Sequence, residues 1–170
     1  MKKIMFSDKF GLTEAVLSGR KTMTRRICPD GTPLGNWAET VKKSRYQVGE
    51  VVAVAQRYRD FILNPISIPA DMGWFNKLFV RADLMPHQIR ITNVRVERLQ
   101  DISDEDCIKE GIWMAENVGF QGVSYWYPNL CNSKFKTPRE AYAALIDRIS
   151  GKGTFESNPY VFVYEFELIK

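Results

Sequence analysis

The sequence predicts an α+β fold, mainly β, arranged as a small mixed or antiparallel β-barrel with two or three flanking helices. Strand-like segments do not alternate with helices in the rhythm of a parallel sheet. In the long β-rich segment 88–99 the apolar residues change parity at Thr92–Asn93, which predicts a bulge or sharp bend. Strongly bent strands suit a small barrel better than a flat sheet.

The N-terminal third predicts a strand, a helix and a second strand. Residues 3–6 read as a short strand, and apolar residues from Leu12 to Val16 follow the spacing of one helical face. Gly19 stands where a helix C-terminus favours a left-handed residue, so the helix should end there. The following residues 22–27 have strand character.

The middle of the chain predicts strands separated by long irregular segments. We expect long loops at about residues 28–46, 60–86 and 113–136, where prolines, glycines or aromatic residues interrupt any periodicity. A strand follows Gly49, and residues 77–84 read as another short strand.

Two helices and a closing strand complete the prediction. Ser103 is placed to cap a helix that Gly111 ends. Thr137, Pro138 and Glu140 form the start signal of the clearest helix in the chain. Residues 158–168 are predicted to form a C-terminal strand. No repeat or linker divides residues 1–170, so we expect one domain.

Composition and charge narrow the classes of function. The 170 residues carry a formal net charge of +4, which admits nucleic-acid or nucleotide partners without requiring them. Cys28, Cys107 and Cys131 are far apart and His87 is the only histidine, so we expect neither a disulfide framework nor a metal site, and no cofactor. No apolar run approaches the roughly 20 residues of a membrane span, and a cytoplasmic setting is the expectation.

The segment GRKTMTRR, residues 19–26, is the first candidate site. It combines cationic and hydroxyl side chains, namely Arg20, Lys21, Thr22, Thr24, Arg25 and Arg26. In a regular strand Met23 and Ile27 would face the core. A strand that begins only at Thr22 would leave Lys21 in the preceding turn, free to approach the same space as Thr24. The alternative is an exposed basic edge strand, since such charges also protect strand edges.

Glu110 is the second candidate. It lies in the last turn of its predicted helix, where its carboxylate meets the negative end of the helix dipole. Such a residue is either a solvated glutamate or a functional acid placed at some cost.

Several blocks of the sequence resemble one family. The blocks LSGRKTMTRRI, YQVGEVVAV, ITNVRVERLQDISDEDCIKEGI and NPYVFVYEFE resemble the ASCH domain family, in particular its bacterial and phage-borne single-domain members. The resemblance implies a PUA-like fold, a small β-barrel with flanking helices, that binds RNA, a nucleoside or a nucleotide in a basic cleft. Arg20, Thr22, Arg25 and Arg26 would then contact the ligand.

The resemblance also implies a reaction. Compact bacterial members of the family are amidohydrolases that deacetylate N4-acetylcytidine. On this resemblance Thr24 would be the nucleophile, Lys21 its activating base and Glu110 the proton donor. The long segments at 28–46, 60–86 and 113–136 make this chain longer than those enzymes. A third reading is a phage or prophage accessory protein that acts through a protein partner, which the aromatic segment 113–136 would contact.

Overall fold

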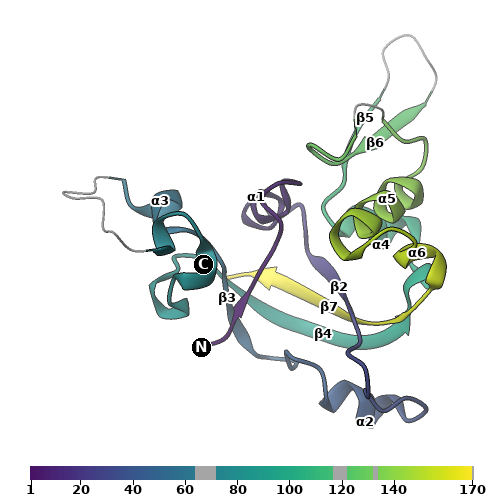
Figure 1. Ribbon diagram of the computed structural model, residues 1–170, viewed down its shortest axis with the longest axis horizontal. Helices are drawn as coiled ribbons and strands as arrows, with labels where there is room; N and C mark the ends of the chain where they lie inside the picture. The colour runs from purple at the N-terminus through teal and green to yellow at the C-terminus, as the bar shows by residue number, and fades with distance from the viewer. Residues whose placement is uncertain (64–71, 117–121, 132–133, 170) are drawn as a thin grey trace.

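A mixed five-stranded sheet forms the centre of the computed structural model, which describes residues 1–63, 72–116, 122–131 and 134–169 (Figure 1). Its strand order is β1-β3-β4-β7-β2, and a separate hairpin pairs β5 with β6. The strands are β1 (Lys3–Ile4), β2 (Met23–Ile27), β3 (Val51–Val54), β4 (Gln88–Arg98), β5 (Trp113–Glu116), β6 (Val123–Trp126) and β7 (Tyr160–Leu168).

Six α-helices occur in the described part of the chain. They are α1 (Leu12–Leu17), α2 (Trp37–Lys42), α3 (Tyr58–Phe61), α4 (Asp104–Lys109), α5 (Pro138–Ser150) and α6 (Thr154–Ser157). Short 3₁₀ helices lie at Met72–Trp74, Lys77–Phe79, Ala82–Leu84 and Leu99–Asp101. In Figure 1, α1 and the group of α4, α5 and α6 lie on one side of the long strands β4 and β7, and α2 lies beyond the other side.

The hydrophobic core lies between this sheet and the helices α1 and α5. Leu12 and Val16 from α1 and Leu145 from α5 pack with the inward residues of β4 and β7, such as Ile91 and Val163. All five side chains are buried, and such burial is the main favourable term in folding. The core therefore fixes α1, β2, α4 and α5 around one point above the sheet.

The two glycine stops that the sequence predicts are confirmed. Gly19 has φ of 74° and Gly111 has φ of 96°, the left-handed region that a helix end favours. Both glycines matter for the site, because each one follows the end of a helix and lies close in the sequence to a candidate residue.

The predicted caps and the predicted bulge are also confirmed. The Ser103 side chain accepts a hydrogen bond from the Asp106 backbone N–H, and the Thr137 side chain accepts one from Glu140. The register between β4 and β7 shifts between Ile91 and Asn93, which is the position where the apolar parity changes.

The predicted long loops contain more regular structure than expected. Asn36 caps α2 within the segment expected to be a loop at 28–46, and the segment 113–136 holds the β5–β6 hairpin. Residues 77–84, predicted as a strand, form two 3₁₀ turns instead. The Asn76 side chain accepts a hydrogen bond from the Leu78 backbone, a local contact that favours a turn over a strand. Residues 64–71, 117–121 and 132–133 of these segments lie outside the described residues.

The α+β class is confirmed, and the sheet is open in the residues described. β1 and β2 are the two ends of the strand order, and no described pairing joins them into a closed barrel. The helix count exceeds the two or three predicted because α2, α3 and α6 are single short turns of four to six residues. Such short helices carry little periodic signal in a sequence.

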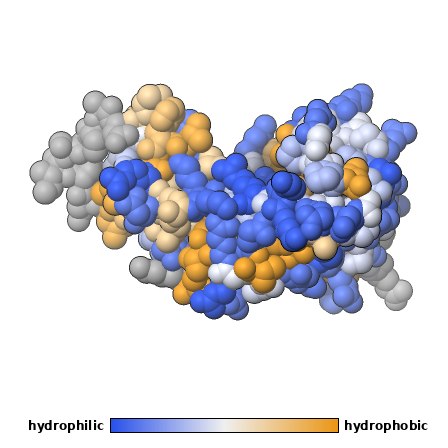
Figure 2. Space-filling view, turned by 90° about the horizontal axis from the view of Figure 1, so that it is seen from below, coloured by the Kyte–Doolittle hydropathy of each residue, from blue (hydrophilic) through white to orange (hydrophobic). Residues whose placement is uncertain are grey.

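Polar side chains dominate the face of the molecule seen from below (Figure 2). Apolar side chains gather at the end that carries α3 and the 3₁₀ turns after it, where Met72, Phe75 and Leu78 are exposed. None of the helices described is long and apolar enough to cross a membrane.

Candidate functional site

Lys21 is buried in the turn between α1 and β2. The left-handed Gly19 ends α1, and β2 begins only at Met23, so Lys21 lies outside the strand as the sequence allowed. Its side chain is only 1% exposed. The Nζ atom donates to the backbone oxygens of Met23 at 2.7 Å and Glu110 at 3.0 Å, and to Glu110 Oε2 at 2.5 Å. All three protons of the ammonium group therefore have acceptors.

Glu110 reaches Lys21 because α4 ends against α1. Glu110 is the C-cap of α4 and is only 3% exposed, so it is not the solvated glutamate that one reading of the sequence allowed. A Cβ added at Gly111 would lie 3.1 Å from Ala15 Cβ and 3.2 Å from Lys21 Cβ. Only glycine permits this close approach at a positive φ, and the approach places the two charged residues in contact.

Arg25 holds the other oxygen of the same carboxylate. Its Nη1 atom lies 3.2 Å from Glu110 Oε1, and its Nη2 atom lies 2.6 Å from Glu97 Oε1 and 2.7 Å from Asp106 Oδ2. Arg95 contacts Glu97 and Asp106 from the outer side. Glu110 is thus fixed between two cations, and a ligand would meet a carboxylate whose orientation is already set.

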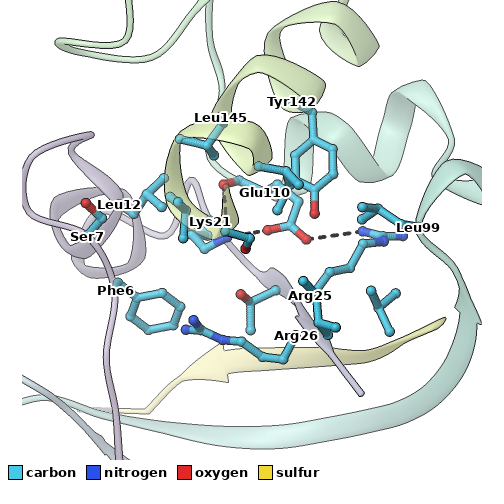
Figure 3. A pocket seen from close by; sticks show the side chains of 16 residues that line it. Phe6, Ser7, Leu12, Lys21, Arg25, Arg26, Leu99, Glu110, Tyr142 and Leu145 are labelled. Atoms are coloured by element: carbon cyan, nitrogen blue, oxygen red, sulfur yellow. Dashed lines mark hydrogen bonds and ion pairs between the residues drawn. The ribbon is translucent and has the colours of Figure 1, made fainter. Parts of the chain in front are cut away.

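Lys21, Thr24 and Glu110 line one pocket of about 100 Å³, here called the inner pocket (Figure 3). The pocket lies between α1, β2, the end of α4 and α5. Its other lining residues are Phe6, Ser7, Leu12, Arg25, Arg26, Ile27, Leu99, Tyr142, Leu145, Ile146, Ile149, Ser150 and Val161. The three residues that the family resemblance joins are therefore close neighbours in space, although they come from separate parts of the sequence.

One hydroxyl of the inner pocket is completely buried and has no hydrogen bond within the described residues, that of Tyr142. Figure 3 shows it on the side of Glu110. Thr24 is also buried and brings a second hydroxyl to the pocket. Burial raises the pKa of Tyr142 well above its ordinary value, so the hydroxyl keeps its proton and can donate it. An unsatisfied buried hydroxyl is costly, and a ligand with an acceptor would relieve that cost.

Burial also changes the acidity of Lys21. Removal from water lowers the pKa of the Lys21 ammonium below its ordinary value, and the neighbouring Glu110 carboxylate opposes that shift. Arg26 and Arg25 lower the pKa further through repulsion. The proton between Lys21 and Glu110 is therefore held less firmly by lysine than it would be in water.

The remaining predicted ligand residues are divided between the pocket and its surroundings. Arg25 lines the inner pocket, but its guanidinium group is taken up by three carboxylates. Arg26 lines the pocket and has no carboxylate partner among the described residues. Thr22 and Arg20 do not line it. The Arg20 guanidinium group donates to the Gly111 carbonyl at 2.6 Å and lies 3.9 Å from the centre of the Trp113 ring.

The prediction that Met23 and Ile27 both face the core is correct only for Met23. Met23 is buried, whereas Ile27 on the same parity is 41% exposed. Thr24 and Arg25, on opposite faces of the strand, are both buried. Carboxylates from β4 and α4 enclose Arg25, and Thr24 lines the inner pocket together with residues of α5. Near its start, β2 therefore has buried side chains on both faces.

Sequence reasoning missed Tyr142 and Phe6 as residues of the pocket. Tyr142 is one of the buried residues of α5, among leucine, isoleucine and alanine side chains. The available signal was its hydroxyl, because a tyrosine among leucine and isoleucine needs a polar partner for its oxygen. Phe6 gave no signal beyond its place in a short strand.

No group of histidine, cysteine and carboxylate side chains able to hold a metal ion occurs within the described ranges. The inner pocket itself brings together the side chains of Lys21, Thr24, Glu110 and Tyr142. They supply a cation, a carboxylate and two hydroxyl groups at the end of a pocket with apolar walls.

Comparisons with known proteins give a distant likeness. No protein-family model and no curated protein matches the sequence. A solved structure from Enterococcus faecalis, described by the family model DUF984, is similar with 14% identity and a TM-score of 0.48, covering 99% of this chain and 77% of that chain. An ASCH domain from Lactobacillus crispatus is similar with 14% identity and a TM-score of 0.45, covering 96% of this chain and 75% of that chain. The second structure belongs by its name to the ASCH family, which the sequence blocks resemble. At this low identity and TM-score, neither structure assigns a ligand or an activity to this chain.

Proposed function

We propose that this chain binds a base of RNA, or of a nucleoside or nucleotide, in the inner pocket. The observation that carries the proposal is the convergence of Lys21, Thr24 and Glu110 on one pocket that also contains the buried, unpaired hydroxyl of Tyr142. The resemblance of the GRKTMTRR segment and the α4 region to the ASCH family supports the same ligand class.

The chemistry of the inner pocket suits a nucleobase. Its volume of about 100 Å³ admits a small planar group but not a whole nucleotide. Phe6, Leu12 and Leu145 supply apolar walls, which favour the faces of a ring. Thr24 and Tyr142 supply hydroxyls for the polar edge of that ring. A small pocket with few polar groups at one end is typical of sites that orient a base.

Equilibrium binding of nucleosides at low salt tests this proposal. Isothermal titration of the purified chain with cytidine, uridine, adenosine and guanosine should show a preference for one base. Thr24→Val should weaken that binding, because valine keeps the shape and removes the hydroxyl. Thr22→Val is the matched control, since Thr22 belongs to the same segment and does not line the pocket. Equal affinity of the two variants, or no binding of any nucleoside, would contradict the proposal.

Hydrolysis of an acylated base is a second candidate function. The specific observation in its favour is the lowered pKa of Lys21 beside a buried carboxylate, in a pocket that the Thr24 side chain also lines. A threonine hydroxyl becomes an effective nucleophile only when a nearby base removes its proton. A buried lysine with a lowered pKa is a suitable base for that step.

The proposed reaction begins with a proton shift within the Lys21–Glu110 pair. In the structure the ammonium group is fully hydrogen-bonded, so Lys21 acts as a base only after its proton passes to Glu110. Neutral Lys21 then accepts the Thr24 proton as Oγ1 attacks the amide carbonyl carbon. The protonated Glu110 gives its proton to the departing amino group of the base. Water hydrolyses the resulting threonine ester and releases the acid.

Release of cytidine and acetate from N4-acetylcytidine tests the reaction. Wild-type protein should produce both in equal amounts. Thr24→Val and Glu110→Gln should abolish the release, whereas Thr22→Val should retain it. Activity that persists in Thr24→Val would contradict the nucleophile assignment. Binding of nucleosides without any release would leave the chain as a binding protein.

A further inference from the structure

A larger cavity, here called the outer cavity, lies next to the inner pocket. Its volume is about 350 Å³, and it shares Arg26 and Ile27 with the inner pocket. Its other walls come from β1, β7 and the segment after α2, including Lys43, Arg45 and Tyr46. The two spaces are therefore neighbours on either side of the Arg26 side chain.

The charge of the outer cavity is uniformly positive. Lys3, Arg26, Lys43 and Arg45 line it, and no lining residue is acidic. Within the described part of the chain, no carboxylate lies within ion-pair distance of Arg26, Lys43 or Arg45, although sixteen such pairs occur elsewhere. The inner pocket differs, because its buried cations are already paired with Glu110 and its neighbours. The positive potential of the outer cavity therefore favours the binding of an anionic group of a ligand there.

Local contacts fix the walls of the outer cavity but leave donors free. The Lys3 ammonium group is used to hold the carbonyl oxygens of Leu78 and Val80, so only its aliphatic chain faces a ligand. The Nη2 atom of Arg26 donates a hydrogen bond to the Met5 carbonyl at 2.5 Å, and the other guanidinium nitrogens have no hydrogen-bond partner in the described residues. The Arg45 guanidinium group contacts the side chain of Tyr46 and lies 5.6 Å from the centre of its ring. Arg26, Lys43 and Arg45 have no carboxylate partner within the described residues, so their charge can still attract one anion.

Aromatic rings form the floor of the outer cavity. Tyr46 and Tyr164 meet edge to face with ring centres 5.2 Å apart, and Phe162 lies beside Tyr164. The Tyr46 hydroxyl donates to the Lys3 carbonyl at 2.9 Å, and the Tyr164 hydroxyl accepts from the Arg45 backbone N–H at 3.2 Å. The rings are therefore held in place and present apolar surface beside the cations, a combination suited to a sugar–phosphate unit.

We infer that the outer cavity binds the phosphate-bearing part of the ligand whose base occupies the inner pocket. This inference rests on the proposed base binding and adds the ligand class, a nucleotide unit instead of a bare nucleoside. The phosphate contacts Arg26, Lys43 and Arg45, and Arg26 lies between the base and the phosphate. The shared chemistry is a phosphate group, which either a free nucleotide or an RNA strand supplies.

Titration of the full chain with cytidine, cytidine 5′-monophosphate and a short cytidine-containing RNA tests this inference. The monophosphate should bind about tenfold or more tightly than cytidine, the gain expected from hydrogen bonds to a charged group. The double variant Lys43→Ala/Arg45→Ala should lose that gain and leave cytidine affinity unchanged. Rising salt should weaken the monophosphate and not the nucleoside. Lys42→Ala is the matched control, because Lys42 carries the same charge at a neighbouring position outside the cavity and pairs with Glu39.

The outcomes separate the two proposals and the two sources of phosphate. If RNA binds more tightly than the monophosphate and Lys43→Ala/Arg45→Ala removes this difference in affinity, the phosphate comes from an RNA strand. Equal affinities identify a free nucleotide. If nucleosides fail to bind but the variants still weaken RNA, the base proposal fails and the phosphate site stands. If Lys43→Ala/Arg45→Ala binds phosphate-bearing ligands no differently from Lys42→Ala, the outer cavity is not a phosphate site.

Discussion

The ammonium group of Lys21 lies 2.5 Å from the carboxylate of Glu110, although 89 positions separate the two residues in the sequence. Both side chains are almost completely removed from water. A buried pair of this kind rarely stabilises a fold more than apolar residues of the same volume would. Both residues also line the inner pocket, so the pair can be tested for stability and for binding in the same variants.

The pair is asymmetric, because Glu110 has two cationic partners. Glu110→Ala should destabilise the fold by about 3–5 kcal/mol, since it leaves both Lys21 and Arg25 without this carboxylate. Lys21→Met should cost less, because Glu110 keeps its contact with Arg25. Urea unfolding followed by circular dichroism gives both values. A larger loss for Lys21→Met than for Glu110→Ala would refute this ranking.

An exposed pair provides the control for that measurement. The side chains of Lys42 and Glu39 are 67% and 55% exposed and lie 2.7 Å apart. Removing either should change the free energy of unfolding by about 0–1 kcal/mol, as is usual for surface pairs. A large effect there would show that the contribution of the buried pair cannot be read from such variants.

The three cysteines should differ in reactivity toward a thiol reagent. Cys131 is exposed, Cys28 is half-buried and Cys107 is buried, and burial raises the pKa of the Cys28 and Cys107 thiols. In native protein at pH 8 Cys131 should react first and Cys28 slowly. Cys107 should react only after urea is added. Mass spectrometry of labelled peptides identifies the order, and early labelling of Cys107 would contradict the described packing of α4.

Stability should fall in alkali partly because of Cys107. Burial raises the pKa of this thiol from 9.0 to about 12. The folded state therefore holds a proton that the unfolded state releases above pH 9, so the stabilisation is complete below pH 9 and is lost as the pH rises to 12. The loss amounts to at most about 4 kcal/mol. Cys107→Ala should show a shallower decline over this range in urea unfolding, and parallel profiles would exclude the effect.

The sequence predicts the parts of the site that depend on local backbone preferences. Gly19 and Gly111 are recognised as helix ends because both positions need a positive φ, and each leaves a charged residue at the pocket. The parity change at Thr92–Asn93 likewise reveals the bulge in β4. These features need no knowledge of distant contacts.

Features that depend on distant packing do not appear in the sequence. Glu110 resembles an ordinary surface glutamate until α1 and α5 cover it, and its link to Lys21 came only from the family resemblance. Arg25 has the same local signal as Arg26, yet three carboxylates from β4 and α4 surround it. The outer cavity combines β1, β2, β7 and the segment after α2, so no single stretch of sequence contains it.

Tyr142 and Tyr127 offer a direct test of whether the inner pocket is a binding site. Both hydroxyls are completely buried without a hydrogen-bond partner in the described residues, but only Tyr142 lines the inner pocket. Replacing either with phenylalanine removes an unsatisfied group, so each variant should be as stable as wild type or more stable by about 1–3 kcal/mol.

Ligand binding should separate the two variants. Tyr142→Phe should weaken the binding of the preferred nucleoside about tenfold, because a hydrogen bond from the buried hydroxyl to the base is lost. Tyr127→Phe should leave the affinity unchanged. Thermal unfolding and calorimetric titration of the same samples provide both readouts. If only Tyr142→Phe combines higher stability with weaker binding, the Tyr142 hydroxyl is left unpaired in the fold so that it can bind a ligand. If both variants have equal effects, the hydroxyl has only a packing role.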